Sequence, residues 1–345
     1  MNTHQLTAAP KTDPLEIYRY RDGLYAVDLL TAALTGLDLF TWLSKSPSNQ
    51  EAICKKFEIV ERPADVMLTL FTAMGFLENR AGTFHVTDIA REHLCADSTW
   101  FMGPYYASLK ERPVCKDYLT VLQTGKPANW GSYKNEQEWA KAMEREDFAK
   151  QFTAAMDCRG IYLSQALAKK LDLSLHNRLL DIAGGSGIYA CSLIAHHARL
   201  TAAVLEKPPV DRIAREAIAK RGLSDRVAVI ACNMFSDAWP SGFDLHLISN
   251  VLHDWDEPVV RQLLAKSFQA LSPGGMLIIH DVHINREKTG PYPAAAYSAL
   301  LMNITEGKCY SIAEMEGFLQ EAGFEQPAFC ETAADRSFIS ARKIS

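Results

Sequence analysis

The chain has 345 residues and a mass of 38.4 kDa, which suggests two domains at roughly 150 residues per domain. Its composition, 48% hydrophobic and 22% charged, is that of a soluble globular protein that builds its core without disulfides or metals. The net charge of −5 argues against a bulk attraction to nucleic acid or to an anionic membrane.

The spacing of the cysteines and the length of the apolar segments disfavour several further classes of protein. The eight cysteines are scattered and form no C-x-x-C pair, which disfavours a zinc knuckle or a redox dithiol. Residues 1–10 lack the apolar stretch of a signal peptide, and no uncharged apolar run reaches the length of a membrane span. These features predict a reduced, cytoplasmic protein without a membrane partner.

The N-terminal part of the chain reads as a helical domain. Residues 15–100 carry apolar side chains at helical spacing, after a stretch over 1–14 that reads as a flexible tail. Two short helices followed by a hairpin are typical of a winged helix. The expected elements are, in chain order, a helix over 26–34, a short helix after the capping signal Ser48-Asn49-Gln50-Glu51, a helix opened by Pro63 and ended by Gly75, and a hairpin of residues 76–78 and 84–86.

A winged helix often binds DNA, but the charge of this one disfavours that function. Residues 1–100 hold nine Lys or Arg and thirteen Asp or Glu, a net charge of −4. A helix that reads DNA should be basic, because phosphate contacts dominate affinity, and no Lys or Arg lies between Pro63 and Gly75. We therefore expect a packing or dimerisation role and no nucleic-acid partner.

Residues 101–175 read as a helical linker that contributes to a substrate pocket and to a dimer. A loop from Gly125 to Gly131 interrupts its helices. Phe148, Phe152 and Met156 recur at helical spacing, and such a stripe belongs either to the core or to an apolar pocket. A further helix is expected to carry Leu163, Leu167 and Leu171.

From residue 176 to residue 345, apolar strands alternate with helices. Alternation of this kind implies an α/β domain with a parallel sheet and helices on both faces. The predicted strands are 178–183, 201–206, 226–231, 243–249 and 275–282, and the predicted helices are 187–198, 210–221 and 257–271.

The strongest local signal is a strand that runs into a glycine turn at the start of a helix. The segment reads Leu179-Leu180-Asp181-Ile182-Ala183-Gly184-Gly185-Ser186-Gly187. Glycines let the backbone approach a ligand closely, and the amides of the helix N-terminus then face that ligand. The pattern Gly185-x-Gly187-x-x-Ala190 also fits a dinucleotide fingerprint. Glu206, at the end of the next strand, suits a ribose hydroxyl of either NAD or S-adenosylmethionine (SAM).

The acid before the glycines separates these two cofactors. Asp181 stands where a carboxylate meets a cationic ligand group. It would repel the pyrophosphate of a dinucleotide, whereas SAM carries a sulfonium and an ammonium group. Asp181 therefore favours SAM.

Three motifs in fixed order carry a family resemblance. The glycine turn, Leu252-His253-Asp254-Trp255 and Ser272-Pro273-Gly274-Gly275 resemble the SAM-dependent O-methyltransferases typified by the plant caffeic acid and animal acetylserotonin enzymes. The resemblance covers nearly the whole chain. It implies a Rossmann-like class I methyltransferase sheet with a final antiparallel strand near residues 338–342. It also implies a homodimer through an N-terminal all-helical, winged-helix domain whose helices help to close the partner's pocket.

The resemblance also implies the catalytic residues. The family's general base is the His of the Leu-His-Asp-Trp segment, here His253, and histidine suits this role because its pKa lies near neutrality. Asp254 either contacts the substrate or caps the following helix. Of the two acids that flank the base in the family, one matches Asp281, whereas the position of the other holds Cys309, with Glu306 close by in sequence.

One segment of the expected cofactor site differs in sequence from the family. Its Gly-Asp-Met-Phe reads Cys232-Asn233-Met234-Phe235 here, and the side-chain oxygen of Asn233 can still accept the hydrogen bond of the adenine amino group. The expected cofactor-binding residues are Asp181, Gly184, Gly185, Gly187, Glu206, Asn233, Met234, Phe235 and Asn250. The expected substrate-pocket residues are Phe148, Phe152, Met156, Met302 and Cys309.

Together these observations predict a SAM-dependent methyltransferase that acts on a hydroxyl of a small aromatic or polyketide-like metabolite and releases S-adenosylhomocysteine. No metal site is expected. C- or N-methylation and a SAM-dependent reaction without methyl transfer remain open, because one orienting acid is replaced by Cys309. An NAD-dependent oxidoreductase and a non-enzymatic winged-helix regulator are the more distant alternatives.

Overall fold

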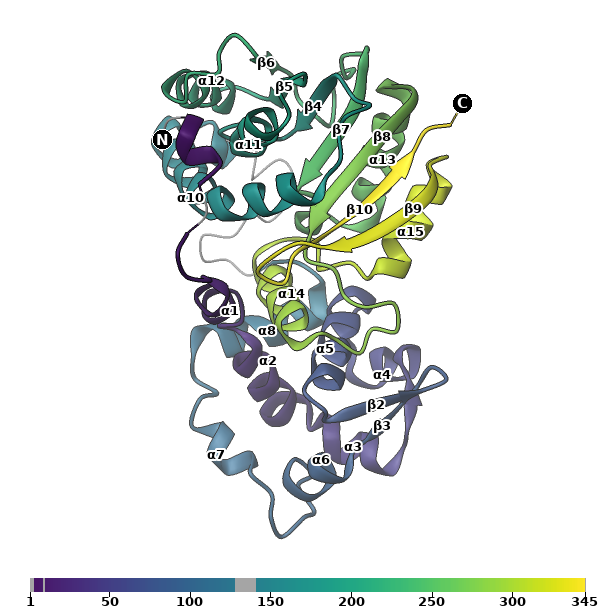
Figure 1. Cartoon of the computed structure of the whole chain (residues 1–345). Helices are drawn as coiled ribbons and strands as arrows, with labels where there is room; N and C mark the ends of the chain where they lie inside the picture. Colours follow the sequence, from purple (N-terminus) through teal and green to yellow (C-terminus); the bar gives the residue numbers. More distant parts are fainter. Residues whose placement is uncertain (1–2, 9, 128–140, 345) are drawn as a thin grey trace. The chain divides into compact units, whose positions relative to one another are not determined.

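The structure is a computed structural model that describes residues 3–8, 10–127 and 141–344 (Figure 1). It divides into two compact units. Unit 1 comprises Met1–Glu16, Glu136–Val282 and Ile312–Ser345, and unit 2 comprises Ile17–Asn135 and His283–Ser311. The four segment boundaries expected from the sequence stay a prediction. The part of the expected loop that follows residue 127 lies outside the described residues.

Unit 1 is built on one seven-stranded sheet with the order β6-β5-β4-β7-β8-β10-β9. The five strands from β6 to β8 run parallel, and β10 pairs antiparallel with both β8 and β9. This confirms the class I methyltransferase sheet and its final antiparallel strand. The strands are β4 (Arg178–Ile182), β5 (Thr201–Glu206), β6 (Val227–Ala231), β7 (Phe243–Ser249), β8 (Leu271–Asp281), β9 (Glu325–Glu331) and β10 (Ser337–Arg342).

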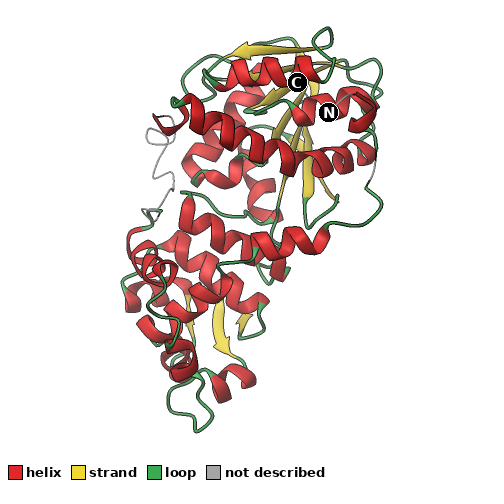
Figure 2. Cartoon of the chain, turned by 90° about the vertical axis from the view of Figure 1, so that its left-hand side faces the viewer, coloured by secondary structure: helices red, strands yellow, loops and turns green. Residues whose placement is uncertain are grey.

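Helices cover both faces of this sheet. One group packs together on one face and stands in front of the strands in Figure 2; it consists of α10 (Glu146–Lys170), α11 (Ile188–His196) and α12 (Val210–Lys220). On the other side, α13 (Glu257–Ala270) and α15 (Ile312–Glu321) contact each other and the strands from β8 to β10. Because both faces are covered, the central strands β4 and β7 are almost wholly buried.

The strand order fixes where a ligand can bind. The chain passes from β4 to β5 in one direction and later places β7 on the other side of β4. Ligands of such sheets bind at the carboxyl ends of the strands, at this switch point. Asp181, Glu206, Asn250 and Asp281 all lie at these carboxyl ends, so the topology gathers the residues singled out in the sequence at one edge.

Unit 2 combines helices with a small antiparallel sheet of order β1-β3-β2. It is predominantly helical, and the expected hairpin forms its second and third strands. α5 packs against α4, α8 and the largely buried α14. The elements of unit 2 are α2 (Ala26–Ala32), the π-helix η2 (Ala33–Leu37), α3 (Leu39–Lys45), β1 (Ser48–Asn49), α4 (Gln50–Phe57), α5 (Glu61–Ala73), β2 (Leu77–Arg80), β3 (Thr83–Val86), α6 (Asp88–His93), α7 (Gly103–Ala107), α8 (Pro113–Thr124) and α14 (Tyr292–Ile304). η1 (Thr3–Leu6) belongs to unit 1, and most of α1 (Leu15–Asp22) belongs to unit 2.

Two helix predictions were wrong. α5 begins at Glu61, two residues before Pro63, because the first helical turn needs no amide donor and so tolerates proline. The two helices expected around residues 148–156 and 163–171 are one continuous helix, α10. Gly160 lies inside this helix. The absence of a side chain there lets α10 approach α11 closely, because a Cβ at this position would lie 2.6 Å from Ile188 Cγ2.

Two strand predictions also need correction. β8 begins at Leu271 and so includes the Ser-Pro-Gly-Gly segment that was expected to precede it. β9 was missed, because its residues are mostly exposed and it lies at the edge of the sheet. Such a strand lacks the apolar alternation that marks a half-buried one.

In the described part of the chain, no single helix is long and apolar enough to cross a membrane.

Candidate active site

The glycine turn joins β4 to α11 in a conformation that only small residues adopt without strain. Gly185 and Gly187 have φ values of +60° and +74°. A Cβ on Gly184 would lie 2.5 Å from the carboxylate carbon of Asp181, whereas nothing lies within 4 Å of a Cβ placed on Gly185. The amide of Gly185 donates to the Glu206 carboxylate at 2.9 Å. The turn is therefore open toward a ligand and is bordered by two acids.

Asp181 is buried and Glu206 is half-buried, and the surrounding protein shifts the pKa of both carboxyl groups. Burial raises the pKa of Asp181 to about 7, opposed by the amide of Ala190 and assisted by repulsion from Glu206. Burial also raises the pKa of Glu206 to about 7, against the effect of the amides of Gly185 and Lys207. A bound cation would relieve this cost, because it favours the ionised carboxylates.

SAM fits these residues. The second carboxylate oxygen of Asp181 is buried and has no hydrogen-bond partner among the described residues. A buried acceptor without a partner is costly, and a positively charged ligand removes that cost. Glu206 offers two oxygens at the end of β5, where the ribose hydroxyls of such a cofactor would bind. These carboxylate acceptors thus suit a cationic nucleoside and not the anionic pyrophosphate of NAD.

The segment after β6 is ordered next to Glu206. The amide of Cys232 donates to the Glu206 carbonyl at 3.0 Å, and the side-chain oxygen of Asn233 accepts the amide of Phe235 at 3.0 Å. The Phe235 ring meets Trp255 edge-on, with centroids 4.9 Å apart. Asn233, Met234 and Phe235 therefore lie at the same sheet edge, and their contact with adenine stays a prediction.

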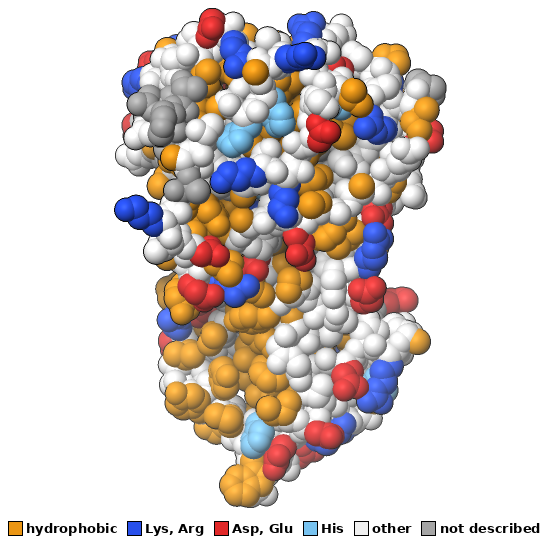
Figure 3. Space-filling model, in the orientation of Figure 1, with side chains coloured by type: hydrophobic (Ala, Val, Ile, Leu, Met, Phe, Trp, Pro, Cys, Tyr) orange, Lys and Arg blue, Asp and Glu red, His pale blue; other side chains and the backbone are white. Residues whose placement is uncertain are grey.

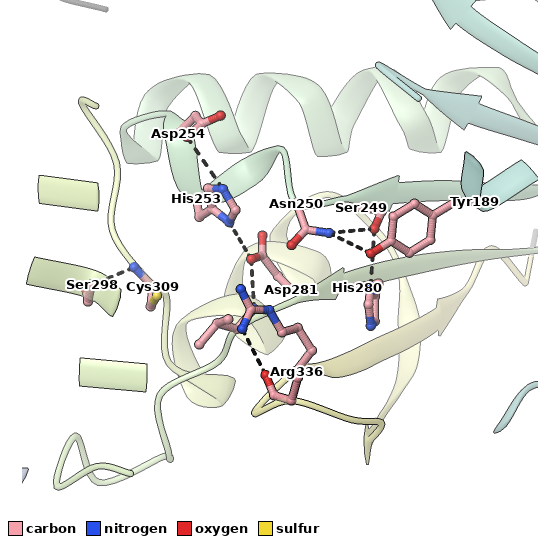
Figure 4. A network of polar contacts seen from close by, with 12 residues as sticks. Tyr189, Ser249, Asn250, His253, Asp254, His280, Asp281, Ser298, Cys309 and Arg336 are labelled. Atoms are coloured by element: carbon pink, nitrogen blue, oxygen red, sulfur yellow. Dashed lines mark hydrogen bonds and ion pairs between the residues drawn. The ribbon is translucent and has the colours of Figure 1, made fainter. Parts of the chain in front are cut away.

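Asn250 is oriented by a partly buried polar network at the end of β7 (Figure 4). It adopts φ +53°, and its Nδ2 donates to the Tyr189 hydroxyl at 3.1 Å and to the Ser249 hydroxyl at 3.0 Å. The Ser249 hydroxyl lies 3.2 Å from His280 Nδ1, and His280 Nε2 lies 3.1 Å from the Thr332 hydroxyl. With its nitrogen engaged, Asn250 presents a buried oxygen that has no partner in the described residues.

His253 and Asp281 form a buried pair at the ends of the neighbouring strands β7 and β8. Leu252–Asp254 form a 3-10 turn just after β7, and Asp281 is the last residue of β8. His253 Nδ1 lies 2.5 Å from the Asp281 carboxylate, and the same oxygen accepts the amide of Val282 at 2.8 Å. This contact assigns the proton of the neutral ring to Nδ1, which leaves Nε2 as the basic nitrogen.

Opposing effects set the pKa of His253. Burial lowers it, but the carboxylates of Asp281 and Asp254 outweigh burial and raise the pKa above its ordinary value. Asp254 lies 3.6 Å from Nε2. Burial raises the pKa of Asp254 as well, although its side chain is 37% exposed, so solvent moderates that shift.

The residues expected to line a substrate pocket fall in both units. In unit 1, Phe148 and Phe152 stack with centroids 6.3 Å apart and pack in a cluster with Val210 of α12. In unit 2, Met302 and Cys309 are buried. Their role in a pocket stays a prediction, as does that of the half-buried Met156.

Cys309 occupies the position of the second family acid, and the nearby glutamate does not stand free to replace it. The amide of Cys309 donates to the Ser298 hydroxyl at 3.1 Å. The Glu306 carboxylate forms an ion pair with Lys126 at 2.6 Å.

Sequence reasoning missed two side chains that bear on this site. Tyr189 orients Asn250, and the positive charge of Arg159 acts on both His253 and Asp254. Arg159 follows Met156 by three residues on one helix, a spacing that places both on one side of α10. That spacing was the available signal for Arg159, whereas nothing in the sequence pairs Tyr189 with Asn250.

Comparison with known proteins identifies the family. The family model for the O-methyltransferase domain matches residues 121–325. The 3-hydroxy-5-methyl-1-naphthoate 3-O-methyltransferase of Streptomyces sahachiroi is 31% identical and aligns over 87% of this chain and 86% of that protein. The N,N-dimethyltransferase OxyT of Streptomyces rimosus is 27% identical, over 84% of each chain.

A solved structure agrees with these matches. The O-methyltransferase family 2 protein of Planctomyces limnophilus, crystallised with apigenin, superposes with a TM-score of 0.90 at 31% identity, over 99% of this chain and 100% of that one. The sheet is thus that of a class I methyltransferase. This chain belongs to the O-methyltransferase family and is a SAM-dependent enzyme.

Proposed function

We propose that this enzyme methylates a hydroxyl of a small aromatic or polyketide-like metabolite, with His253 as the general base. The observation that carries the proposal is the buried contact between His253 Nδ1 and the Asp281 carboxylate. The names of the naphthoate enzyme and of the apigenin complex support the substrate class.

His253, Asp281 and Asp254 have separate roles in the reaction. When bound, SAM supplies an electrophilic methyl group on a sulfonium. Asp281 holds the His253 ring by its Nδ1 proton, so that Nε2 takes the proton of the acceptor hydroxyl as the oxygen–carbon bond forms. The Asp281 carboxylate then stabilises the imidazolium. Asp254, beside Nε2, contacts the acceptor.

The remaining proposed site residues bind the two ligands. Asp181 and Glu206 pair with the charged and hydroxyl groups of the cofactor, with Asn250 presenting its free oxygen at the same edge. Asn233, Met234 and Phe235 meet the adenine, and Gly184, Gly185 and Gly187 let the backbone approach. On the unit 1 side, Phe148, Phe152 and Met156 shape the acceptor pocket.

The proposal is tested by incubating the purified enzyme with methyl-labelled SAM and a set of small hydroxylated aromatics. We expect label on an oxygen of at least one compound, detected by mass spectrometry and lost in His253→Ala. Transfer of label to carbon or nitrogen alone would contradict the proposed acceptor atom.

Cofactor binding should release protons. Burial raises the pKa values of Asp181 and Glu206 to about 7, so part of each carboxyl group is protonated near neutral pH. A cationic ligand favours the ionised carboxylates, so we expect SAM binding to release protons and the affinity for SAM to rise with pH through neutrality. Titration calorimetry in buffers of different ionisation enthalpy measures the release. An affinity that falls with pH in this range would contradict the assignment.

A second candidate function is C- or N-methylation, or a SAM-dependent reaction without methyl transfer. It is favoured by Cys309 at the position of the family's second acid and by the similarity to the N,N-dimethyltransferase OxyT. If O-methylation is limited by the missing carboxylate, Cys309→Glu should raise the rate with phenols several-fold. No gain, with SAM binding intact and Cys309→Gln as the uncharged control, would favour the second candidate.

We also propose that the protein acts as a cytoplasmic homodimer through its N-terminal domain. The surface of unit 2 carries an exposed apolar face over α1, α2 and α7 (Figure 3). Tyr20 is 78% exposed, Tyr105 74% and Trp100 65%, and large exposed apolar patches mark interaction sites. The reduced state of the cysteines, none of which forms a disulfide, is consistent with the cytoplasm.

We expect light scattering to give twice the 38.4 kDa mass of the chain. Tyr105→Glu should shift the enzyme toward the monomer, because a buried unpaired charge is costly at an interface. Phe329→Glu is the matched control, since Phe329 is exposed on the edge strand of unit 1. A wild-type monomer at micromolar concentration would refute the dimer.

A further inference from the structure

Three polar side chains from separate elements meet at the glycine turn. The Asp157 carboxylate, on α10, accepts hydrogen bonds from the Ser186 hydroxyl and from the guanidinium of Arg221. The same guanidinium donates to the Ser186 carbonyl at 3.0 Å. Ser186 and Arg221 are 5% and 6% exposed. Ser186 is thus held both at its side chain and at its backbone.

The turn needs such a restraint, because glycines flank Ser186 on both sides. Gly185 and Gly187 both have positive φ values, and glycine crosses between backbone conformations at little cost. The peptide group between Ser186 and Gly187 leads into the N-cap of α11, which begins at Ile188. By holding the Ser186 carbonyl, Arg221 fixes the orientation of this peptide group.

The face of α10 that carries Asp157 is docked tightly onto α11. Gly160, three residues on, allows the close approach to Ile188. The hydroxyls of Ser164 and Ser192 lie 2.7 Å apart and are buried between the two helices. Residues 157, 160 and 164 share one helical face. Asp157 is the member of this face that reaches the glycine turn, and Ser164 is the member that reaches α11 farther along.

We infer that Asp157 is a positioning residue that pre-orders the glycine turn for SAM through Ser186 and Arg221. Pre-ordering raises affinity because a turn that is already fixed loses less conformational entropy on binding. Among the bonds described, Asp157 contacts Ser186 and Arg221 and neither His253 nor Asp281. The inference rests on the binding of SAM at this turn and is independent of the role of His253 as a base.

A second consequence concerns α10 itself. Phe152, Met156 and Arg159 lie on the same helix as Asp157. Because binding free energies are reciprocal, a cofactor that orders the turn also orders the helix linked to it. In the wild type we therefore expect SAM to slow hydrogen exchange in residues 148–160 as well as in the turn, and we expect this added protection to be weaker in Asp157→Asn.

The test compares Ser186→Ala with Ser164→Ala. Both variants remove one buried hydroxyl, but of the two only the Ser186 hydroxyl is bonded to Asp157. We expect Ser186→Ala to weaken SAM binding about tenfold by calorimetry, with kcat at saturating SAM within twofold of wild type. In the cofactor-free protein, amide hydrogen exchange over residues 184–190 should be faster in Ser186→Ala. Ser164→Ala should change neither the dissociation constant nor the exchange of the turn.

Asp157→Asn is the direct test of the carboxylate, and its loss of SAM affinity should match or exceed that of Ser186→Ala. Because the uncharged amide would leave the buried Arg221 without its anion, the variant carries a folding cost. The double variant Asp157→Asn/Arg221→Gln removes both charges and keeps the test valid if the single variant does not fold. Unchanged SAM affinity and unchanged exchange of the turn in Ser186→Ala and in the folded Asp157 variant would overturn the inference.

Discussion

His253→Ala should lower kcat by about 10²- to 10⁴-fold, the usual contribution of a general base. The variant removes Nε2, the nitrogen left basic by the contact between Nδ1 and Asp281. SAM affinity should stay within a few-fold of wild type, because the two acids that border the glycine turn are untouched. The matched control is His196→Ala, at the end of α11, whose Nδ1 contacts only the backbone carbonyl of Ser192 among the bonds described; it should keep its kcat.

Asp281→Asn tests the same pair through its pH profile. The Asp281 carboxylate raises the pKa of His253, so its replacement by an uncharged amide should lower that pKa. The acid limb of kcat/KM then moves to lower pH, while the plateau falls because the imidazolium loses its counter-charge. A His253→Ala enzyme with more than a tenth of wild-type activity, or an Asp281→Asn profile shifted to higher pH, would exclude His253 as the base.

Asp181→Asn should strongly weaken SAM binding while stabilising the cofactor-free protein at alkaline pH. Removal of one partner of a buried charge pair typically costs 2–5 kcal/mol, so SAM affinity should fall by roughly 10²-fold or more. The asparagine oxygen can still accept the amide of Ala190, as the carboxylate does at 3.2 Å.

The expected gain in stability follows from the raised pKa of Asp181. Its folded value of about 7 exceeds the ordinary 3.8. The native state therefore binds more protons than the unfolded chain between about pH 4 and pH 7, and stability falls as the pH rises through that window. Asparagine lacks this cost, so at pH 8 the cofactor-free variant should be more stable by a few kcal/mol at most.

Thermal unfolding at pH 5 and pH 8, with and without SAM, measures both effects. The matched control is Asp244→Asn, because Asp244 lies at the start of β7, at the opposite edge of the sheet, and accepts the amides of Asn177 and Arg178. That variant should lose stability at both pH values and keep its SAM affinity. A cofactor-free Asp181→Asn protein that is less stable than wild type at pH 8 would refute the account of the buried charge.

The parts of the fold that the sequence predicted are those with local signals. Asp181 is the penultimate residue of an apolar strand and precedes three glycines, so its place near a strand end can be recognised within nine residues. The final antiparallel strand followed from the family resemblance and not from its own pattern. β9 was not predicted, because an exposed edge strand has little periodicity. The continuity of α10 was not predicted, because the close approach of Gly160 to Ile188 is visible only in the folded structure.

The site residues that could be predicted are likewise those with a signal in the nearby sequence. His253 and Asp281 stand in motifs, and the sheet brings their strand ends together. By contrast, Asp157, Ser186 and Arg221 are up to 64 residues apart and belong to no shared motif. Tyr189 and Asn250 likewise meet only through folding. A sequence shows which residues follow strands, but the contacts between distant helices depend on packing that no short pattern encodes.

Unit 2 is formed by an early and a late segment of the chain, which limits how the enzyme can be cut into fragments that fold. Its helix α14 lies late in the chain, at Tyr292–Ile304, yet packs on α5, α8 and α2 from the first part of the chain. During synthesis, the core of unit 2 can therefore be completed only after residue 304 has been added to the chain. A fragment over 176–345 would carry ten buried α14 side chains without the surfaces that cover them. Exchange of N-terminal domains between relatives should accordingly succeed only when α14 is exchanged with them.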